Sequence, residues 1–203
     1  HVYCESPMAH TLADARAIAG AVRAAKTVFQ VVLEGRTNPV YKLARSFFRS
    51  DSVREVVSMR GQARQKTSGR VPASDPARDK MLNWRLDESV SLGLAGEWAA
   101  QQLDVFCWYR DMYPVSIRGW GDVVVHKDGR KVADTIGLEA IYPDGRRLAY
   151  DATLGGSYEG KYELFCGGNA SIKLAWTHGW TRPRKGGRCT PTASASTTTR
   201  ASR

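Results

Sequence analysis

The sequence predicts an α+β protein in which an open, mostly antiparallel β-sheet is covered by helices on one face. Two features favour this class. Apolar residues at helical spacing dominate the chain up to about residue 110, and short apolar runs separated by turn signals follow. Helices followed by adjacent hairpins are typical of a single sheet with helices on one side. A chain of 203 residues with 42% hydrophobic content is long enough for one such core.

The first 35 residues predict a strand, a helix and a second strand. Thr11 with Asp14 forms a capping-box start, which predicts a helix over 12–25. The run TVFQVVLEG, residues 27–35, is apolar, rich in β-branched residues and ends in Gly35, so a buried strand is expected there. This order is typical of the closing unit of a larger α/β sheet. The apolar positions at helical spacing are Leu12, Ala15, Ile18, Ala19 and Val22.

Two further helices and a long loop are expected in the middle of the chain. Asn38-Pro39 supplies an N-cap and a first-turn proline for a helix over 39–49. The segment LAGEWAAQQLDVFCWYRD predicts a helix over about 94–110. Between them, residues 64–93 are rich in Arg, Ser, Pro and Asp with little periodicity, which predicts a long loop around Asn83, Trp84 and Arg85. Long ordered loops in compact domains are often functional.

The second half of the chain predicts antiparallel strands. Turn signals occur at KDG, residues 127–129, and at PDG, residues 143–145. Neighbouring hairpins then form one antiparallel sheet. The β-rich runs are residues 115–125, 132–142, 147–154, 157–166 and 170–176.

The net charge of +10 does not predict nucleic-acid binding, because most of it lies at the C-terminal end. Residues 181–203 carry six basic side chains and no acid, no aromatic residue interleaves with them, and no zinc-finger spacing is present. This stretch consists mainly of Thr, Ser, Ala, Arg, Gly and Pro, so we predict a disordered basic tail. No stretch approaches the roughly 18 apolar residues of a membrane span, and no membrane partner is expected.

The four cysteines, at 4, 107, 166 and 189, form no CxxC pair and have no His at ligand spacing, so no metal site is expected. Three lie in apolar runs, which favours reduced core thiols and a cytoplasmic location. The chain opens HVYCESP without an initiator Met and without a secretory-signal pattern. We therefore expect a piece of a longer protein, whose targeting information could precede His1.

Several segments, in the same order, resemble the Gfo/Idh/MocA oxidoreductases, the family of glucose–fructose oxidoreductase and inositol dehydrogenase. The resemblance covers residue 2 to about residue 180. Members combine an N-terminal Rossmann domain, which binds NAD or NADP, with a C-terminal α/β domain built on an open, mostly antiparallel sheet. The matching segments are VYCESPMAHTLADARAI, VFQVVLEGRTNPVY, GLAGEWAAQQLD, DGRKVADTIGLEAIYPDGRRLAYDATL and YEGKYELFCGGNASIKLAW.

The resemblance implies that residues 1–35 are the C-terminal remnant of a Rossmann domain and that residues 36–180 are the substrate-binding domain. It implies NAD or NADP as cofactor, with Glu5 and Pro7 on the cofactor side and Pro7 in the cis form. A GxGxxG turn before a helix is absent, and Gly119-Trp120-Gly121 fits a bulge or bend instead. We therefore expect the chain by itself not to bind the cofactor.

By the same resemblance, the catalytic positions of the family fall on Ser6, Glu97 and Gln101, where a Lys, an Asp and a His are commoner. Glu97 keeps the carboxylate. Gln101 does not titrate near neutrality and cannot act as a general base, and Ser6 carries no charge. The fold is unaffected by these departures, but slow or absent catalysis is expected, because loss of a general base typically costs a factor of about 10² to 10⁴ in rate.

Substrate-binding roles are assigned to Trp84 and Arg85 in the long loop and to Asp104, seven residues beyond Glu97; packing explains Trp84 and Arg85 equally well and Asp104 at least as well. The implied function is the substrate side of an NAD(P)-dependent oxidoreductase that acts on a sugar, a polyol or a derivative. A non-catalytic carbohydrate-binding or scaffolding relative and an NAD-dependent glycosidase-type relative stay open as alternatives. The open sheet face makes a homo-oligomer a further expectation.

Overall fold

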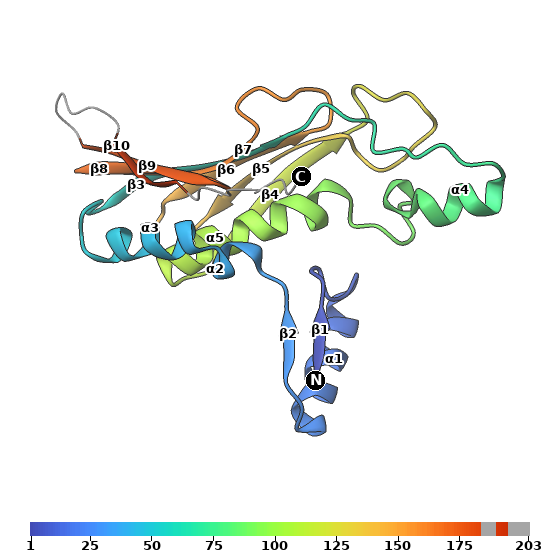
Figure 1. Ribbon diagram of the computed structural model, residues 1–203, viewed down its shortest axis with the longest axis horizontal. Coiled ribbons are helices and arrows are strands. Elements are labelled where there is room, and N and C mark those ends of the chain that lie inside the picture. Colours follow the sequence, from blue (N-terminus) through green and yellow to red (C-terminus); the bar gives the residue numbers. More distant parts are fainter. Residues whose placement is uncertain (184–189, 195–203) are drawn as a thin grey trace, which may run out of the picture.

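The computed structural model describes residues 1–183 and 190–194. Figure 1 shows an open sheet, a layer of helices packed beneath it, and an arm that extends away from the helices. The arm, residues 1–33, contains β1 (Val2–Cys4), α1 (Leu12–Ala25) and β2 (Phe29–Val31). The helical layer contains α2 (Glu34–Thr37), α3 (Pro39–Arg49), the π-helical segment η2 (Ala95–Ala99) and α5 (Ala100–Arg110). This α+β arrangement is the predicted fold class.

The arm is a small β-α-β unit. β1 and β2 pair in parallel, with Val2 opposite Phe29, and α1 connects them. The helix starts where the sequence predicted, since the hydroxyl of Thr11 accepts a hydrogen bond of 3.0 Å from the backbone N–H of Asp14. β2 is shorter than the predicted strand 27–35, because the chain turns into α2 at Glu34. No residue of α1 is buried by the described part of the chain.

Within the described residues the sheet has eight strands in the order β10-β9-β8-β7-β3-β6-β5-β4, and every neighbouring pair is antiparallel except β3 and β6. The predicted mostly antiparallel sheet is therefore confirmed. The strands are β3 (Val56–Arg64), β4 (Ser116–Asp122), β5 (Thr135–Ile141), β6 (Arg147–Thr153), β7 (Lys161–Gly167), β8 (Ala170–Ala175), β9 (His178–Pro183) and β10 (Thr190–Ser194).

Strand β3 was not predicted, and its position corrects the expectation of an unbroken run of hairpins. It lies between β6 and β7, parallel to the first and antiparallel to the second. Arg and Gln side chains interrupt its apolar residues, so its sequence has no clear period of two. Gly61 is needed at its centre, because an added Cβ would lie 2.7 Å from the ring of Tyr150 and 3.1 Å from that of Phe106.

The predicted loop 64–93 also contains structure. Residues 76–82 form α4 (Pro76–Leu82), whose N-cap Asp75 accepts a hydrogen bond of 2.9 Å from the N–H of Arg78. A single 3₁₀ turn, η1 (Trp84–Leu86), follows. An aspartate N-cap followed by a first-turn proline is a helix-start signal, and the short length of α4 hid its periodicity.

The C-terminal prediction needs a partial correction. Residues 178–183 form β9, which pairs with β8, and residues 190–194 form β10, which pairs with β9. A low-complexity segment can therefore extend the sheet, since edge pairing satisfies backbone N–H and C=O groups without requiring large apolar side chains. The rest of the predicted tail, residues 184–189 and 195–203, lies outside the described residues.

The main core lies between α3, α5 and the sheet. Its centre is aromatic: the rings of Tyr109 and Phe165 stack with centroids 4.8 Å apart, and Phe106 lies 4.9 Å from Phe165. Among the described residues no helix covers the other face of the sheet in Figure 1, and Trp120, opposite Gly137 on that face, is 58% exposed. The helices thus cover one face only, as predicted.

A buried polar cluster joins the helical layer to the middle of the sheet. The carboxylate of Glu163, on β7, accepts hydrogen bonds of 2.6 Å from the hydroxyl of Tyr41 and 2.6 Å from the amide of Gln102. The hydroxyl of Tyr150 donates to the same amide's oxygen at 3.0 Å. Burial raises the pKa of Glu163, although the two donors oppose that effect.

This raised pKa predicts a pH-dependent stability. A carboxyl group whose pKa is higher in the folded state takes up a proton on folding, so its favourable contribution is lost as the pH rises from the unfolded-state pKa through the folded-state value. Glu163→Gln removes the ionisable group. Urea denaturation at several pH values from about 4 to about 8 should show the stability of E163Q rising relative to that of the unaltered protein.

The matched control is Glu55→Gln, because the Glu55 side chain is 86% exposed and pays no burial penalty. Its stability difference from the unaltered protein should show no comparable rise over this range. A difference between E163Q and the unaltered protein that stays constant with pH would contradict the account of Glu163.

Candidate active-site cavity

A cavity of about 550 Å³ lies where the arm meets the helical layer. Its walls come from the turn after β1, from α2, η1 and η2, from the start of α5, and from the first residue of β7. We call it the junction cavity. It is lined by Glu5, Ser6, Pro7, His10, Glu34, Trp84, Arg85, Glu97, Trp98, Gln101 and Lys161.

The structure brings the three predicted catalytic positions together. Ser6, Glu97 and Gln101 all line the junction cavity, and the side-chain nitrogen of Gln101 donates a hydrogen bond to the hydroxyl of Ser6. Glu97 belongs to η2, just before α5, so two segments about ninety residues apart supply the group. Their roles in catalysis remain predictions.

Gln101 is the central hydrogen-bonding residue of this cavity. Besides Ser6, its nitrogen donates to the carbonyl of Val32 at 3.2 Å, and its oxygen accepts from the N–H of Glu34 at 3.2 Å. The amide thus binds both β1's following turn and the end of β2. The Gln101 amide nitrogen donates two hydrogen bonds and its oxygen accepts one. A histidine could not replace it, because each imidazole nitrogen carries at most one hydrogen.

Glu97, Arg85 and Trp84 form a row along one wall. The Nε of Arg85 donates to the carboxylate of Glu97 at 3.3 Å, and the guanidinium carbon of Arg85 lies 4.5 Å from the centroid of the Trp84 ring. The Glu97 side chain is mostly shielded, whereas that of Arg85 is largely exposed. An exposed arginine in such a pair contributes little stability but places donors at the mouth of the cavity.

Glu5 and Pro7, the two residues assigned to the cofactor side, flank Ser6 on the same wall. The Ser6–Pro7 peptide bond is cis, as the resemblance implied. The described residues do not offer a cradle for a pyrophosphate, since the turn from Ser6 to Thr11 that precedes α1 contains no glycine. The assignment of Glu5 and Pro7 to the cofactor side stays a prediction.

Asp104 is not brought to the cavity. Its carboxylate forms a two-fold ion pair with Arg36, with nitrogen–oxygen distances of 2.8 and 2.7 Å, and it is mostly buried. The expectation that it shares a face with Glu97 assumed a regular α-helix. The π-helical segment Ala95–Ala99 has a wider turn, which rotates the following residues relative to Glu97. Asp104 therefore anchors α2 to α5.

Four residues that line the junction cavity were not predicted as site residues: His10, Glu34, Lys161 and Trp98. The ammonium group of Lys161, at the start of β7, lies 3.9 Å from the carboxylate of Glu34. Nothing in the local sequence marks Lys161, because only the fold brings β7 to α2. Trp98 packs against a buried apolar cluster that includes Ile136 and Leu154, and it also lines the cavity.

No cluster of three or more His, Cys, Asp or Glu side chains that could hold a metal ion occurs among the described residues. Cys4, Cys107 and Cys166 are free thiols. Within residues 1–183 and 190–194, no helix has the length and apolar character needed to cross a bilayer.

No family model matches the chain. Among curated proteins, levoglucosan dehydrogenase from Pseudarthrobacter phenanthrenivorans is 28% identical over 106 residues, which are 52% of this chain and 25% of that protein. A solved levoglucosan dehydrogenase, in complex with NADH and levoglucosan, superimposes with a TM-score of 0.79 at 18% identity, over 96% of this chain and 54% of that one.

Two other solved structures share the fold. The aldose-aldose oxidoreductase of Caulobacter crescentus, complexed with glycerol, has a TM-score of 0.76 at 19% identity, covering 96% of this chain and 56% of that chain. A super-repressor mutant of Gal80p from Saccharomyces cerevisiae has a TM-score of 0.79 at 12% identity, with coverages of 96% and 53%. The chain thus spans about half the length of the solved proteins that it matches.

The Gln101 contacts predict that the arm opens when this side chain is shortened. Gln101→Ala removes the hydrogen bonds to Ser6, Val32 and Glu34, each with a net worth of about 0.5–1.5 kcal/mol. Amide hydrogen exchange in β1 and β2 should therefore accelerate, while exchange in β3 and β7 stays unchanged. Gln65→Ala is the control, because Gln65 is exposed and its side chain makes no hydrogen bond to a described residue. Equal exchange in both variants would show that Gln101 does not hold the arm.

Proposed function

From its confirmed resemblance to Gfo/Idh/MocA-type oxidoreductases, we propose that this chain is the substrate-side portion of an NAD(P)-dependent oxidoreductase. Its substrate is a sugar, a polyol or a derivative, oxidised or reduced by hydride transfer. The observation that carries the proposal is the junction cavity, in which Ser6, Glu97 and Gln101 meet from segments distant in sequence. Levoglucosan dehydrogenase and aldose-aldose oxidoreductase, which share this fold, are named for sugar oxidoreduction.

The proposed roles follow from the chemistry of each side chain. When bound, NAD or NADP supplies the hydride acceptor, beside Glu5 and Pro7. Glu97 is the carboxylate among the three catalytic positions and therefore the candidate for taking the hydroxyl proton, and Arg85 donates a hydrogen bond to it at 3.3 Å. Ser6 and Gln101 can orient a substrate hydroxyl through hydrogen bonds but cannot accept the proton near neutral pH.

Substrate binding is proposed for Trp84 and Arg85. A flat indole suits the apolar face of a sugar ring, and a guanidinium supplies paired donors to hydroxyl groups. Asp104, occupied by Arg36, is not part of this proposal. Ser6 is uncharged, so Lys161 of β7 supplies a cation to the cavity wall. This ammonium group lies beside the carboxylate of Glu34.

A non-catalytic relative is the second candidate function. It is favoured by the hydrogen bonds of Gln101, which use this amide to hold the arm instead of leaving it free for substrate. A repressor protein, Gal80p, has the same fold, and the fold alone therefore does not require catalysis.

Domain division and assembly are part of the same proposal. Residues 1–35 are the end of a nucleotide-binding domain and residues 36–180 form the substrate-binding domain. The sheet face without helices is the surface for a homo-oligomer, and the free thiols Cys4, Cys107 and Cys166 favour a cytoplasmic location.

We expect the chain by itself not to bind NAD(H) or NADP(H), because it lacks the glycine-rich turn.

A chimera that supplies the missing half tests catalysis. The cofactor-binding domain of levoglucosan dehydrogenase would replace residues 1–4, so that Ser6 is kept, and fluorescence of bound NADH would verify assembly. We expect slow or absent turnover of polyols, raised by about 10² or more on combining Ser6→Lys with Gln101→His, since a base is restored. The two changes should be non-additive, because both groups act on one hydroxyl.

The control is Lys66→His in the same chimera, which adds a histidine at an exposed position that lines neither the junction cavity nor the cavity beside it and should leave turnover unchanged. Turnover of the unaltered chimera near the typical value of about 10 per second would contradict the inactive-site hypothesis. Glu97 would then be the leading candidate for the base.

A further inference from the structure

A second cavity, of about 310 Å³, lies next to the junction cavity. The two share three lining residues, Arg85, Glu97 and Trp98, and so lie on either side of the Arg85–Glu97 ion pair. We call the second one the loop cavity, because residues of the 65–93 segment and of the β4–β5 connection form its walls. Its other lining residues include Gln65, Thr67, Leu94, Arg130 and Leu154.

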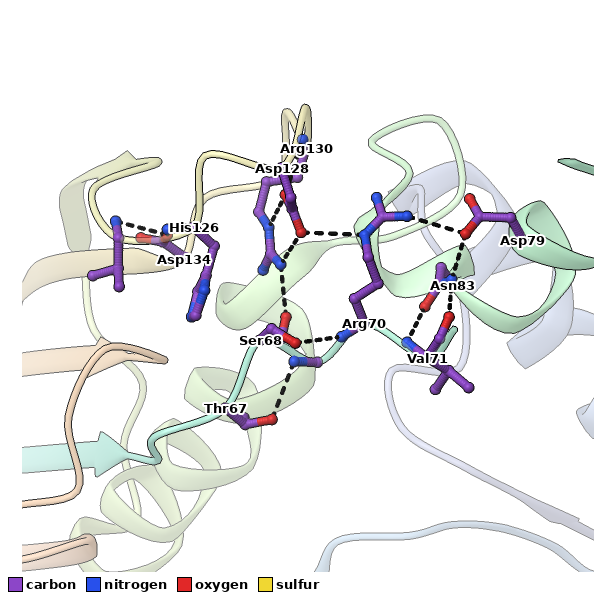
Figure 2. A network of polar contacts seen from close by, with 12 residues as sticks. Thr67, Ser68, Arg70, Val71, Asp79, Asn83, His126, Asp128, Arg130 and Asp134 are labelled. Carbon is purple, nitrogen blue, oxygen red and sulfur yellow. Dashed lines mark hydrogen bonds and ion pairs between the residues drawn. The ribbon is translucent and has the colours of Figure 1, made fainter. Parts of the chain in front are cut away.

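A continuous polar network holds one wall of the loop cavity in place, as Figure 2 shows. Arg70 links two carboxylates from different segments, with distances of 3.2 Å to Asp128 and 3.0 Å to Asp79. The buried amide of Asn83 accepts a hydrogen bond of 2.7 Å from the N–H of Val71 and donates one of 2.9 Å to its carbonyl. The long loop is therefore fixed against both α4 and the β4–β5 connection.

Arg130 is the buried polar residue of this wall. Its side chain is 1% exposed. Its Nε and Nη2 bind the carboxylate of Asp128 at 2.8 and 2.6 Å, and Nη2 also donates to the carbonyl of Ser68 at 2.7 Å. These hydrogen bonds to Asp128 and Ser68 fix the guanidinium of Arg130 and compensate its buried charge.

The charges of the loop cavity are balanced. Arg130 strongly lowers the pKa of Asp128, so the two form a permanent ion pair, and Arg85 is paired with Glu97. The other walls combine Trp98 and aliphatic side chains with the amide of Gln65 and the hydroxyl of Thr67. Paired charges, an aromatic surface and neutral hydrogen-bonding groups suit an uncharged polyhydroxy ring better than a phosphate or a carboxylate.

We propose that the loop cavity is a second subsite, which binds the neighbouring sugar ring of a substrate with two units. It rests on the proposed function, because the first ring must occupy the junction cavity. The Arg85–Glu97 pair stands between the rings, where both side chains can hydrogen-bond hydroxyls of either one. The cavity volume of about 310 Å³ leaves room for a single ring and not for a longer chain.

The test compares one-ring and two-ring sugars on the 203-residue chain by calorimetry. The probes are glucose and galactose, and the disaccharides maltose, cellobiose and melibiose. At least one disaccharide should bind about ten-fold or more tightly than its constituent monosaccharide, since the second ring gains its own contacts. Gln65→Trp, at an exposed position that lines only the loop cavity, should remove this gain and leave monosaccharide binding unchanged.

Lys66→Trp is the matched control, because residue 66 is equally exposed and lines neither cavity. It should change neither affinity. The second subsite would be overturned if disaccharides bound no more tightly than monosaccharides, or if both tryptophan variants lost the same disaccharide affinity. Either result would leave the proposed function standing. Absence of binding by every sugar in the panel would overturn the proposed function and the subsite together.

Discussion

The hydrogen bond from Gln102 to the buried carboxylate of Glu163 fixes how the helix over residues 95–110 sits on the sheet. The same amide also donates to the backbone carbonyls of Gln62 and Tyr162, at 3.1 and 3.0 Å, which ties the helix to β3 and β7 at once. Because Gln102 faces the sheet, its neighbour Gln101 faces the arm. The position of the junction cavity therefore depends on a contact that lies outside it.

Much of this arrangement could be predicted from the sequence because it depends on local signals. Capping residues and helical spacing place α1 and α3, and the KDG and PDG turns place the hairpins of β4, β5 and β6. β3 was missed for a physical reason: a central strand is stabilised by neighbours on both sides, and its own pattern need not alternate. The strands β9 and β10 depend on edge pairing, which composition does not reveal.

The lining of the junction cavity, too, could be predicted only in part from the sequence. Ser6, Glu97 and Gln101 were identified by resemblance, whereas Lys161 and His10 reach the cavity only through the tertiary fold. Asp104 was misplaced because the π-helical segment changes the phase of the helix, and no residue in AGEWA signals a π turn. Motif positions thus identified cavity residues in the arm and on the helix, whereas Lys161 comes from the sheet, where no motif marks it.

The central claim is that the junction cavity holds a sugar or polyol ring, and a crystal structure of the 203-residue chain soaked with myo-inositol tests it most directly. The account predicts one ring in that cavity, with hydroxyl oxygens at hydrogen-bond distances of about 2.6–3.2 Å from the Glu97 carboxylate and from Ser6 or Gln101. An empty junction cavity at a saturating concentration, with the polyol bound only on the uncovered face of the sheet, would contradict it.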